Sequence, residues 1–407
     1  MGKGLGCARA SLTVTLFAWG AAGALPSEAV AGPYQYTPVV DSAGPFGTSG
    51  MTDHALGNNG HVVFANLRDD GQNSINRWNG SSLQTVAVTG PTAPGWTTAL
   101  HGVGVNGSGQ VSFVGWRTAT QSEGYFGAYR GEVPSTVTTI SEVPLNQAGP
   151  AYEFGTDINA SGTVAYHRVE STSRGIYTRN GAGAEQTIFV APSADTLGFW
   201  SINSSGHVAI TGVIGGVRGV WKGTGNGALT PIATGNFSSV RTPVIDDAGN
   251  VTFSATLTNG TSGLYRGNGS GGLTTIADTS GGAIVNNANA FARTSSNNDG
   301  DVAFMGTPTG GSPGIHFLPA GGNLADAQEV ISIGDELFGG IVESVFLNPR
   351  GLNDADQIAF MYRVLLPGQT TTTWGLAVAA IPEPSGLALL GLGAAALLRR
   401  RRRVVRH

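Results

Sequence analysis

The chain has 407 residues, of which 40% are apolar, 64 are glycine and one is cysteine, and its formal net charge is −4. That length and apolar content suffice for a large core, and glycines without a three-residue period exclude a collagen-like chain. Eight of the 22 basic and two of the 26 acidic residues lie in the terminal segments, so the interior holds 14 basic against 24 acidic residues. An acidic interior argues against nucleic acid as a partner.

Residues 1–31 have the features of a secretory signal peptide. Lys3 and Arg9 precede and flank an apolar run over residues 10–25, and Ala29 and Ala31 form a small-residue cleavage site before Gly32. The alternative, an uncleaved anchor, is disfavoured by that site. Cleavage would remove the single cysteine, so the exported domain must be stabilised by its core without disulfides.

One motif, Asn/Asp-x-x-Gly-x-Val-x-Phe, recurs seven times at steps of 43 to 56 residues. Alternating apolar residues predict a half-buried strand, and the preceding Asn/Asp-x-x-Gly predicts a tight turn with a positive φ at glycine. In the first copy Gly57 replaces the Asn, and in the last an Asp, which tolerates positive φ, replaces the glycine. The seven anchor positions are Gly60, Gly109, Gly162, Gly206, Gly249, Gly300 and Asp356.

Three further strand signals accompany the motif in most copies. A Gly-x-aromatic segment follows at residues 76–78, 127–129, 175–177, 219–221, 263–265, 314–316 and 375–377, although the last two have lost the aromatic residue. A third strand is predicted at residues 83–88, 137–141, 186–190, 229–233, 273–277 and 329–333. A weaker fourth segment carries an aromatic residue before the next anchor: Trp96, Phe154, Trp200, Phe237, Phe291 and Phe346.

Repeats of three or four strands and about 50 residues are typical of β-propeller blades. The third strand occurs only six times, whereas residues 36–40 resemble it and have no partner upstream. We therefore predict an all-β domain over residues 32–380, a closed seven-bladed propeller in which residues 36–40 pair with residues 375–379. Closure would remove exposed strand edges.

The last segment, residues 381–407, is predicted to be a sorting and anchoring region. Pro382, Glu383 and Pro384 precede an apolar run at residues 385–398. As a helix this run spans only ~21 Å, against a hydrocarbon core of ~30 Å, so we predict a short transmembrane helix. The alternative is an ordinary tail anchor. The helix is followed by a basic cluster of Arg399, Arg400, Arg401, Arg402 and Arg403, expected to stay cytoplasmic.

The order Pro-Glu-Pro, apolar run and arginine cluster resembles the PEP-CTERM sorting signal of Gram-negative bacteria. That resemblance implies recognition by an exosortase, processing near Pro382–Pro384, and delivery to the cell surface or an extracellular polysaccharide matrix. The body of the chain also resembles surface proteins with tandem NxxGxxxF repeats and varied anchors. That family has no assigned catalytic residues, so the resemblance implies none here.

Sequence signals of catalysis or metal binding are weak. No His-x-x-x-His, cysteine pair or Gly-x-Ser-x-Gly segment is present. Segments 246–250 and 297–301 offer clustered oxygens for Ca²⁺, but the repeat's turn already requires them. The acidic pairs 69–70 and 335–336 could serve a glycosidase, but nothing in the sequence places two of them at working distance, and loop solvation is the simpler explanation. Trp96, Trp116 and Trp200 could stack on sugar rings, but we interpret them as blade core.

Two functions remain open from the sequence. The first is a non-enzymatic surface or matrix protein with a structural or binding role, without a cofactor and in contact with extracellular polysaccharide. The second is a polysaccharide-active hydrolase or lyase on a propeller scaffold, because fold alone does not decide function. Asp, Glu, His or Tyr converging at the centre of the ring would favour the enzyme, and Gly, Ser and Thr would favour the binding protein.

Overall fold

The computed structural model describes residues 34–42, 51–67, 72–90, 95–120, 123–133, 136–144, 151–170, 172–225, 227–287 and 289–380. The predicted signal peptide with Ala29, Ala31 and Gly32, the sorting signal from Pro382 to Arg403 and the short apolar helix lie outside these residues. Within them, no helix has the length and apolar character needed to cross a membrane.

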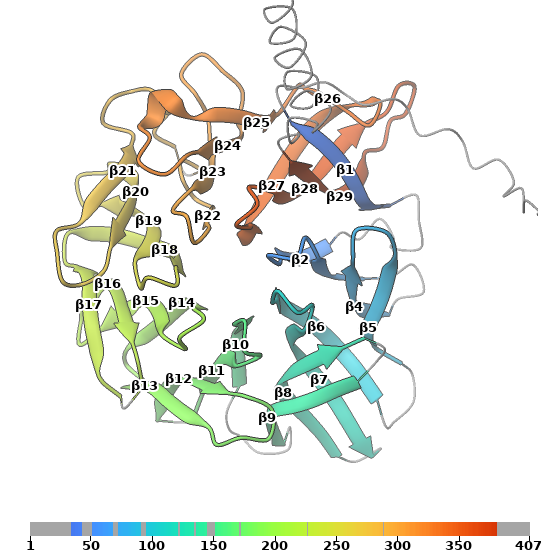
Figure 1. Cartoon of the computed structure of the whole chain (residues 1–407), viewed down its shortest axis with the longest axis vertical. Helices are drawn as coiled ribbons and strands as arrows, with labels where there is room; N and C mark the ends of the chain where they lie inside the picture. The colour runs from blue at the N-terminus through green and yellow to red at the C-terminus, as the bar shows by residue number, and fades with distance from the viewer. Residues whose placement is uncertain are drawn as a thin grey trace, which may run out of the picture.

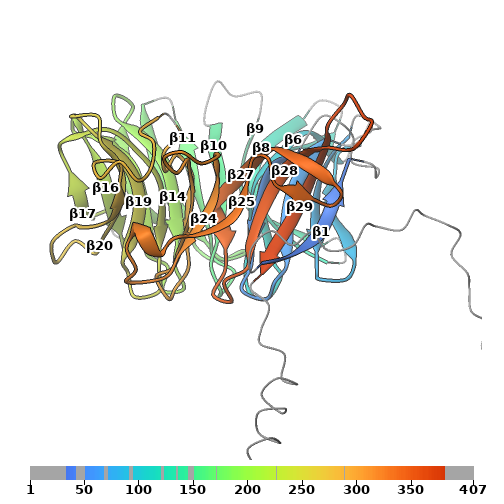
Figure 2. The same ribbon diagram turned by 90° about the horizontal axis from the view of Figure 1, so that it is seen from above.

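In the described part of the chain, seven antiparallel sheets surround a common centre (Figure 1), and together they form a disc when viewed from the side (Figure 2). We call the sheets blades 1 to 7 in chain order. Blades 1 to 6 have four strands each, which run outward from the centre in sequence order. Blade 1 contains β2 (Met51–Leu56), β3 (Val62–Leu67), β4 (Asn73–Trp78) and β5 (Leu83–Val88), and blade 2 contains β6 (Gly95–Val105), β7 (Val111–Thr120), β8 (Glu123–Glu132) and β9 (Thr136–Pro144).

The next four blades repeat this arrangement. Blade 3 contains β10 (Ala151–Ile158), β11 (Val164–Val169), β12 (Ser173–Arg179) and β13 (Gln186–Pro192), and blade 4 contains β14 (Thr196–Ile202), β15 (Val208–Ile214), β16 (Val217–Gly223) and β17 (Leu229–Thr234). Blade 5 contains β18 (Phe237–Ile245), β19 (Val251–Leu257), β20 (Ser262–Gly267) and β21 (Thr274–Asp278). Blade 6 contains β22 (Thr294–Ser296), β23 (Val302–Gly306), β24 (Gly314–Leu318), the short 3₁₀ helix η1 (Leu324–Asp326) and β25 (Gln328–Ser332).

Blade 7 combines strands from both ends of the described chain. Its order is β26 (Glu336–Leu337), β27 (Gly340–Leu352), β28 (Ile358–Leu365), β29 (Thr373–Ala380) and β1 (Gln35–Asp41). Tyr36 lies opposite Ala379 and Val40 opposite Leu376 in the antiparallel β1–β29 pair. The predicted pairing of residues 36–40 with 375–379 is therefore confirmed. In the described part of the chain no ladder joins one sheet to the next, so neighbouring blades are held by side chains.

The anchor turns adopt the predicted conformation in all seven blades. The φ angles of the six anchor glycines lie between 77° and 96°, and that of Asp356 is 54°. In blade 4, the side-chain oxygen of Asn203 accepts a hydrogen bond from the amide of His207 at 2.9 Å. The amide of Gly206 donates to the carbonyl of Asn203 at 3.0 Å. Each such turn connects the innermost strand of a blade to the second strand.

Two details of the repeat differ from the sequence interpretation. The weak fourth segment lies in, or in blade 6 just before, the innermost strand that begins the next blade, so the blade boundary lies before it rather than after it. In blade 1 the residue opposite Phe64 is Asn76, not Trp78, so the Gly-x-aromatic alignment is two residues off there. In the other blades the matching pairs include Phe113 with Tyr129.

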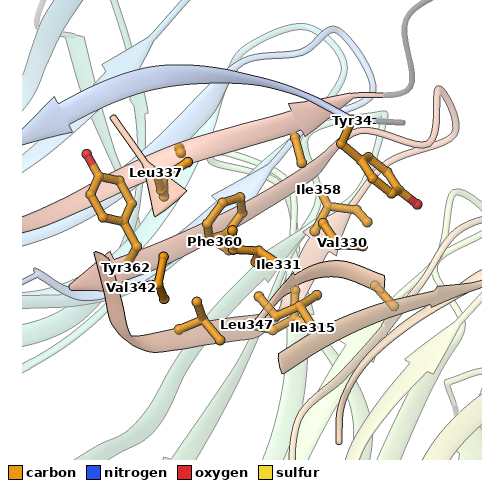
Figure 3. Close-up of a cluster of buried hydrophobic side chains, with 14 of the residues drawn as sticks. Tyr34, Ile315, Val330, Ile331, Leu337, Val342, Leu347, Ile358, Phe360 and Tyr362 are labelled. Carbon is orange, nitrogen blue, oxygen red and sulfur yellow. The ribbon is translucent and has the colours of Figure 1, made fainter. Parts of the chain in front are cut away.

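The core consists of apolar layers between adjacent blades. Figure 3 shows one of them, in which Ile315 and Val330 of blade 6 pack against Leu347 and Phe360 of blade 7. Another layer packs Leu56 and Phe64 of blade 1 against Ala359 and Leu376 of blade 7. The ring therefore closes through apolar packing between the last and the first blade, which the β1–β29 pair supports.

Candidate functional site

A cavity of about 770 Å³ occupies the centre of the ring. All seven innermost strands contribute to its wall, together with the connection that precedes β22. Its volume is in the range of small-molecule sites. Its wall includes charged, polar and aromatic side chains: Asp53, His54, Asp157, Phe199, Trp200, Arg241, Thr242, Arg293, Phe346, Asn348 and Arg350.

Short side chains fasten the innermost strands to one another. Three residues, each two positions before an anchor turn, accept a hydrogen bond from a backbone amide of the next blade. They are Asp157 from Ile202 at 2.9 Å, Ser201 from Ile245 at 2.9 Å, and Ser295 from Leu352 at 3.0 Å. These bonds replace ladders between blades and give the cavity a fixed wall.

The anchor turns surround one end of the channel, where a smaller recess of about 180 Å³ lies. Each turn's Asn side chain donates to the backbone carbonyl of the next turn's first residue. The five bonds are Asn106 to Asn159 at 3.1 Å, Asn159 to Asn203 at 3.1 Å, Asn203 to Asp246 at 2.9 Å, Asn297 to Asn353 at 3.3 Å, and Asn353 to Gly57 at 3.1 Å. The relay is interrupted where Asp246 and Gly57 have no amide to donate.

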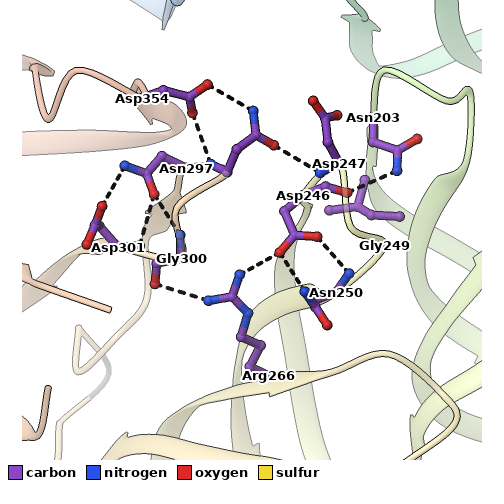
Figure 4. A network of polar contacts seen from close by, with 12 residues as sticks. Asn203, Asp246, Asp247, Gly249, Asn250, Arg266, Asn297, Gly300, Asp301 and Asp354 are labelled. Atoms are coloured by element: carbon purple, nitrogen blue, oxygen red, sulfur yellow. Dashed lines mark hydrogen bonds and ion pairs between the residues drawn. The ribbon is translucent and has the colours of Figure 1, made fainter. Parts of the chain in front are cut away.

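A basic side chain bridges the interruption at Asp246 (Figure 4). Arg266 donates from Nη2 to Asp246 Oδ2 at 2.5 Å and from Nη1 to the carbonyl of Gly300 at 3.1 Å. Asp246 Oδ1 also accepts from the amide of Asn250 at 2.8 Å. In the next turn, Asn297 Oδ1 accepts from the amides of Gly300 and Asp301.

The two calcium candidates, residues 246–250 and 297–301, are therefore engaged in turn and blade contacts. The described part of the chain contains no group of three or more His, Cys, Asp or Glu side chains placed to hold a metal ion. Calorimetric titration with Ca²⁺ tests whether these segments also bind the ion.

Arg350 crosses the cavity from blade 7 to blades 2 and 3. Its Nε lies 2.8 Å from Asp157 Oδ1, and its Nη1 donates to the carbonyls of Thr156 at 2.6 Å and Val103 at 3.2 Å. Burial raises the pKa of Asp157, while the positive charge of Arg350 and hydrogen bonds to the carboxylate lower it. The ion pair therefore compensates a carboxylate that is expensive to bury.

Asp53 is the second buried carboxylate of the wall. Its Oδ1 accepts from the amide of His54 and from Asn348 Nδ2, and its Oδ2 accepts from the amide of Val103 at 3.0 Å. Burial is the main cause that raises the pKa of Asp53, with Arg350 acting in the opposite direction. Burial also lowers the pKa of His54 to about 4, so this imidazole is neutral at pH 7.

Two further arginines lie on the side of blades 5 and 6. Arg293 Nη1 donates to Asn348 Oδ1 at 3.3 Å, and its guanidinium lies 3.5 Å from the centre of the Phe346 ring. Arg241 is exposed and makes no ion pair or side-chain hydrogen bond with the described residues. With Arg350, the wall carries three arginines against Asp53 and Asp157.

The sequence did not single out any of these five charged residues. All precede an anchor turn by two to five positions in or beside an innermost strand, so a charge at that place in the repeat was the available signal. Trp200 is buried core as expected, whereas the core expectation is wrong for Trp116, which is 37% exposed. The side chain of Trp96 and the pair 69–70 lie outside the described residues, and Asp335 accepts from the amide of Ser332 at 2.7 Å.

Two sequence families match parts of the chain. The PEP-CTERM protein-sorting motif matches residues 380–403, which implies an exported protein that passes through a membrane-anchored sorting intermediate and is recognised by an exosortase. A family of unknown function, DUF7453, matches residues 202–328, from the end of β14 to the start of β25. No curated protein matches the chain.

Solved structures share the propeller arrangement at low identity. Virginiamycin B lyase from Staphylococcus aureus is 13% identical, with a TM-score of 0.52 over 84% of this chain and 99% of its own. A puromycin hydrolase S511A mutant complexed with PGG is 12% identical, with a TM-score of 0.50 over 77% of this chain. The chain spans only 50% of that hydrolase. Such similarities concern the fold alone.

Proposed function

We propose that the chain is an exported surface protein whose propeller binds a ligand in its central cavity without chemically converting it. The carrying observation is that Asp53 and Asp157 have both carboxylate oxygens engaged by amides, Asn348 or Arg350. A general acid or base needs an oxygen within reach of the substrate. Here the carboxylates join blades instead.

The residue types alone would support the alternative, a polysaccharide-active hydrolase or lyase. Asp53, His54 and Asp157 do converge on the centre, as the sequence criterion for an enzyme required. Their hydrogen bonds argue for the binding role, because each carboxylate would have to leave its blade contacts to reach a substrate. His54 directs Nε2 to the carbonyl of Ala359 at 3.1 Å, which also makes it part of the blade 1 to blade 7 contact.

For the localisation of the protein, we propose release from its membrane-bound intermediate to the cell surface or the extracellular polysaccharide matrix. Support comes from the match to the sorting motif over residues 380–403 and from the signal-peptide pattern of residues 1–31. The short apolar helix would hold the chain in the membrane until processing near Pro382–Pro384.

Localisation and mass spectrometry of the mature ends test this proposal. We expect the full-length chain to be recovered outside the cytoplasm with ends after Ala31 and near residues 382–384. A variant lacking residues 382–403 should be exported but not retained or processed. A full-length chain that stays unprocessed in the cytoplasm would contradict the proposed localisation. New reducing ends after incubation with the host's polysaccharide would contradict the binding role.

A further inference from the structure

The side of the cavity formed by blades 5 and 6 is built differently from the rest of the wall. Arg241 belongs to the innermost strand of blade 5, and Arg293 lies at the end of the connection from β21 to β22. That connection, residues 279–293, has 15 residues, whereas the others between blades have two to six. Long connections in compact domains are commonly functional.

Unusual backbone conformations place both arginines. Thr242, directly after Arg241, has a φ of 38°, and the β18–β19 register shifts between Arg241 and Val244. Phe291, two residues before Arg293, has a φ of 55°. Positive φ is costly for β-branched and aromatic residues, and bulges redirect side chains next to binding sites. The fold therefore holds both arginines at this position at an energetic cost.

Among the described residues neither of these two arginines forms an ion pair, and Arg293 donates to the neutral side chain of Asn348. Arg350 is paired with Asp157, and Asp53 has its oxygens occupied by amides and Asn348. Burial lowers the pKa of Arg293, and the nearby positive charge of Arg241 lowers it further, while Asp53 acts in the opposite direction. An anion between the two guanidinium groups would relieve their repulsion.

The surroundings of the arginines indicate what carries that anion. Phe199, which is 43% exposed, and Phe346 provide aromatic surface in the same cavity. Arg241 also borders a second cavity of about 330 Å³, between blade 5 and the 279–293 connection. Half of the residues in its wall carry hydroxyl or amide side chains, among them Ser239, Ser254, Thr256 and Asn286. Such groups match the hydroxyls of a sugar better than the apolar side chains of a peptide.

We propose that Arg241 and Arg293 bind the carboxylate of an acidic oligosaccharide, with the next sugar unit in the polar cavity beside Arg241. The planar guanidinium groups match a carboxylate in a two-pronged arrangement. This inference rests on the proposed binding function and specifies its ligand as a uronate-containing chain.

Titration calorimetry with the full-length protein in detergent tests the proposal. Tetragalacturonate is the probe, maltotetraose the neutral control and a tetraglutamate peptide the acidic non-sugar control. We expect binding of tetragalacturonate only, weakened by added salt. Arg241→Ala and Arg293→Lys should each reduce affinity about tenfold or more. Arg218→Ala, which removes an exposed arginine of β16 outside both cavities, should leave it unchanged.

Melting temperatures of the variants separate binding from folding. Arg241 has no partner in the described residues and its charge opposes that of Arg293, so Arg241→Ala should melt no lower than the unsubstituted protein. Equal binding of maltotetraose, or no effect of Arg241→Ala, would overturn the carboxylate assignment. Preference for tetraglutamate would overturn the sugar assignment. If no probe binds while the chain is exported and processed, this inference fails and the proposed localisation stands.

Discussion

Arg350 Nε lies 2.8 Å from Asp157 Oδ1 and joins blade 7 to blade 3 across the central cavity. The two blades are not neighbours in the ring, so this contact spans it rather than following its circumference. Asp157 in turn accepts from the amide of Ile202 in blade 4. One carboxylate thereby connects three blades.

Replacing Arg350 should destabilise the ring. Arg350→Met leaves the carboxylate of Asp157 buried without its counter-ion, which costs ~3–5 kcal/mol for a fully buried pair. Because the Arg350 side chain is 26% exposed, we expect a smaller loss of about 2–3 kcal/mol in the free energy of unfolding. Urea denaturation at pH 7 measures it.

Acid provides the control for that substitution. Without Arg350, the folded-state pKa of Asp157 should rise further above its unfolded value. The stability contributed by Asp157 in the variant is then fully present below the pKa of Asp157 in the unfolded chain. It is lost as pH rises through the higher pKa of Asp157 in the folded variant. The deficit should shrink on acidification, and Asp157→Asn combined with Arg350→Met should recover part of it at pH 7. A deficit independent of pH would contradict the ion-pair explanation.

Gly102 and Gly155 form a second contact between blades, where the backbones of the innermost strands of blades 2 and 3 approach closely. A Cβ built on Gly102 would lie 2.1 Å from the Cα of Gly155, and both residues have positive φ. Gly102→Ala should therefore cost about 3 kcal/mol or more, from backbone strain and overpacking together. Gly206→Ala is the matched control, because its φ is also positive but no atom lies within 4 Å. It should cost roughly 1–2 kcal/mol. If chemical denaturation gave equal losses of unfolding free energy for the two variants, the two strands would be able to move apart and accommodate the added methyl group.

Much of the ring was predictable because its determinants are local and repeated. Each anchor turn requires positive φ and is followed by two inward-facing apolar residues, so seven copies predicted seven blades. The count of third strands predicted the β1–β29 pair. In blade 1 the sequence pattern aligned Trp78 with the aromatic residues of the other blades, because Trp78 is the aromatic residue of that segment. The strand pairing instead places Asn76 opposite Phe64, and this register cannot be derived from the sequence pattern.

The cavity could not be derived in the same way. Arg350 and Asp157 are 193 positions apart in the chain, and their contact depends on where the ring places blades 3 and 7. Pro243 is compatible with a bulge between Arg241 and Val244, but the sequence does not show that Thr242 adopts a positive φ there. The wide spacing before Gly300 and Asp356 was visible, but a longer repeat does not show which way its extra residues fold.

Tyr36 tests the closing strand. Its ring packs edge-on against Phe360 at 6.1 Å, and its hydroxyl donates to the carbonyl of Val330 in blade 6. Because Tyr36 is half-buried, Tyr36→Ala should cost about 2–3 kcal/mol, and Tyr36→Phe about 1 kcal/mol. Thermal melting of both variants measures the difference. If Tyr36→Ala melted like the unsubstituted protein, β1 would contribute nothing to closure.

Asp356 is the anchor at which the repeat departs from glycine, and it makes stability depend on pH. Burial and the carboxylates of Asp301 and Asp299 raise the pKa of Asp356 to about 6, from 3.8. Its stabilising contribution is therefore full below pH 3.8 and lost as pH rises through about 6. Asp356→Asn removes the charge and keeps a residue that tolerates positive φ. We expect the variant to melt about 1–2 °C higher at pH 7, a small gain because Asp356 is partly exposed. The gain should vanish at pH 4, where both proteins are neutral at this position, and an equal gain at both pH values would assign it to the backbone instead of the charge.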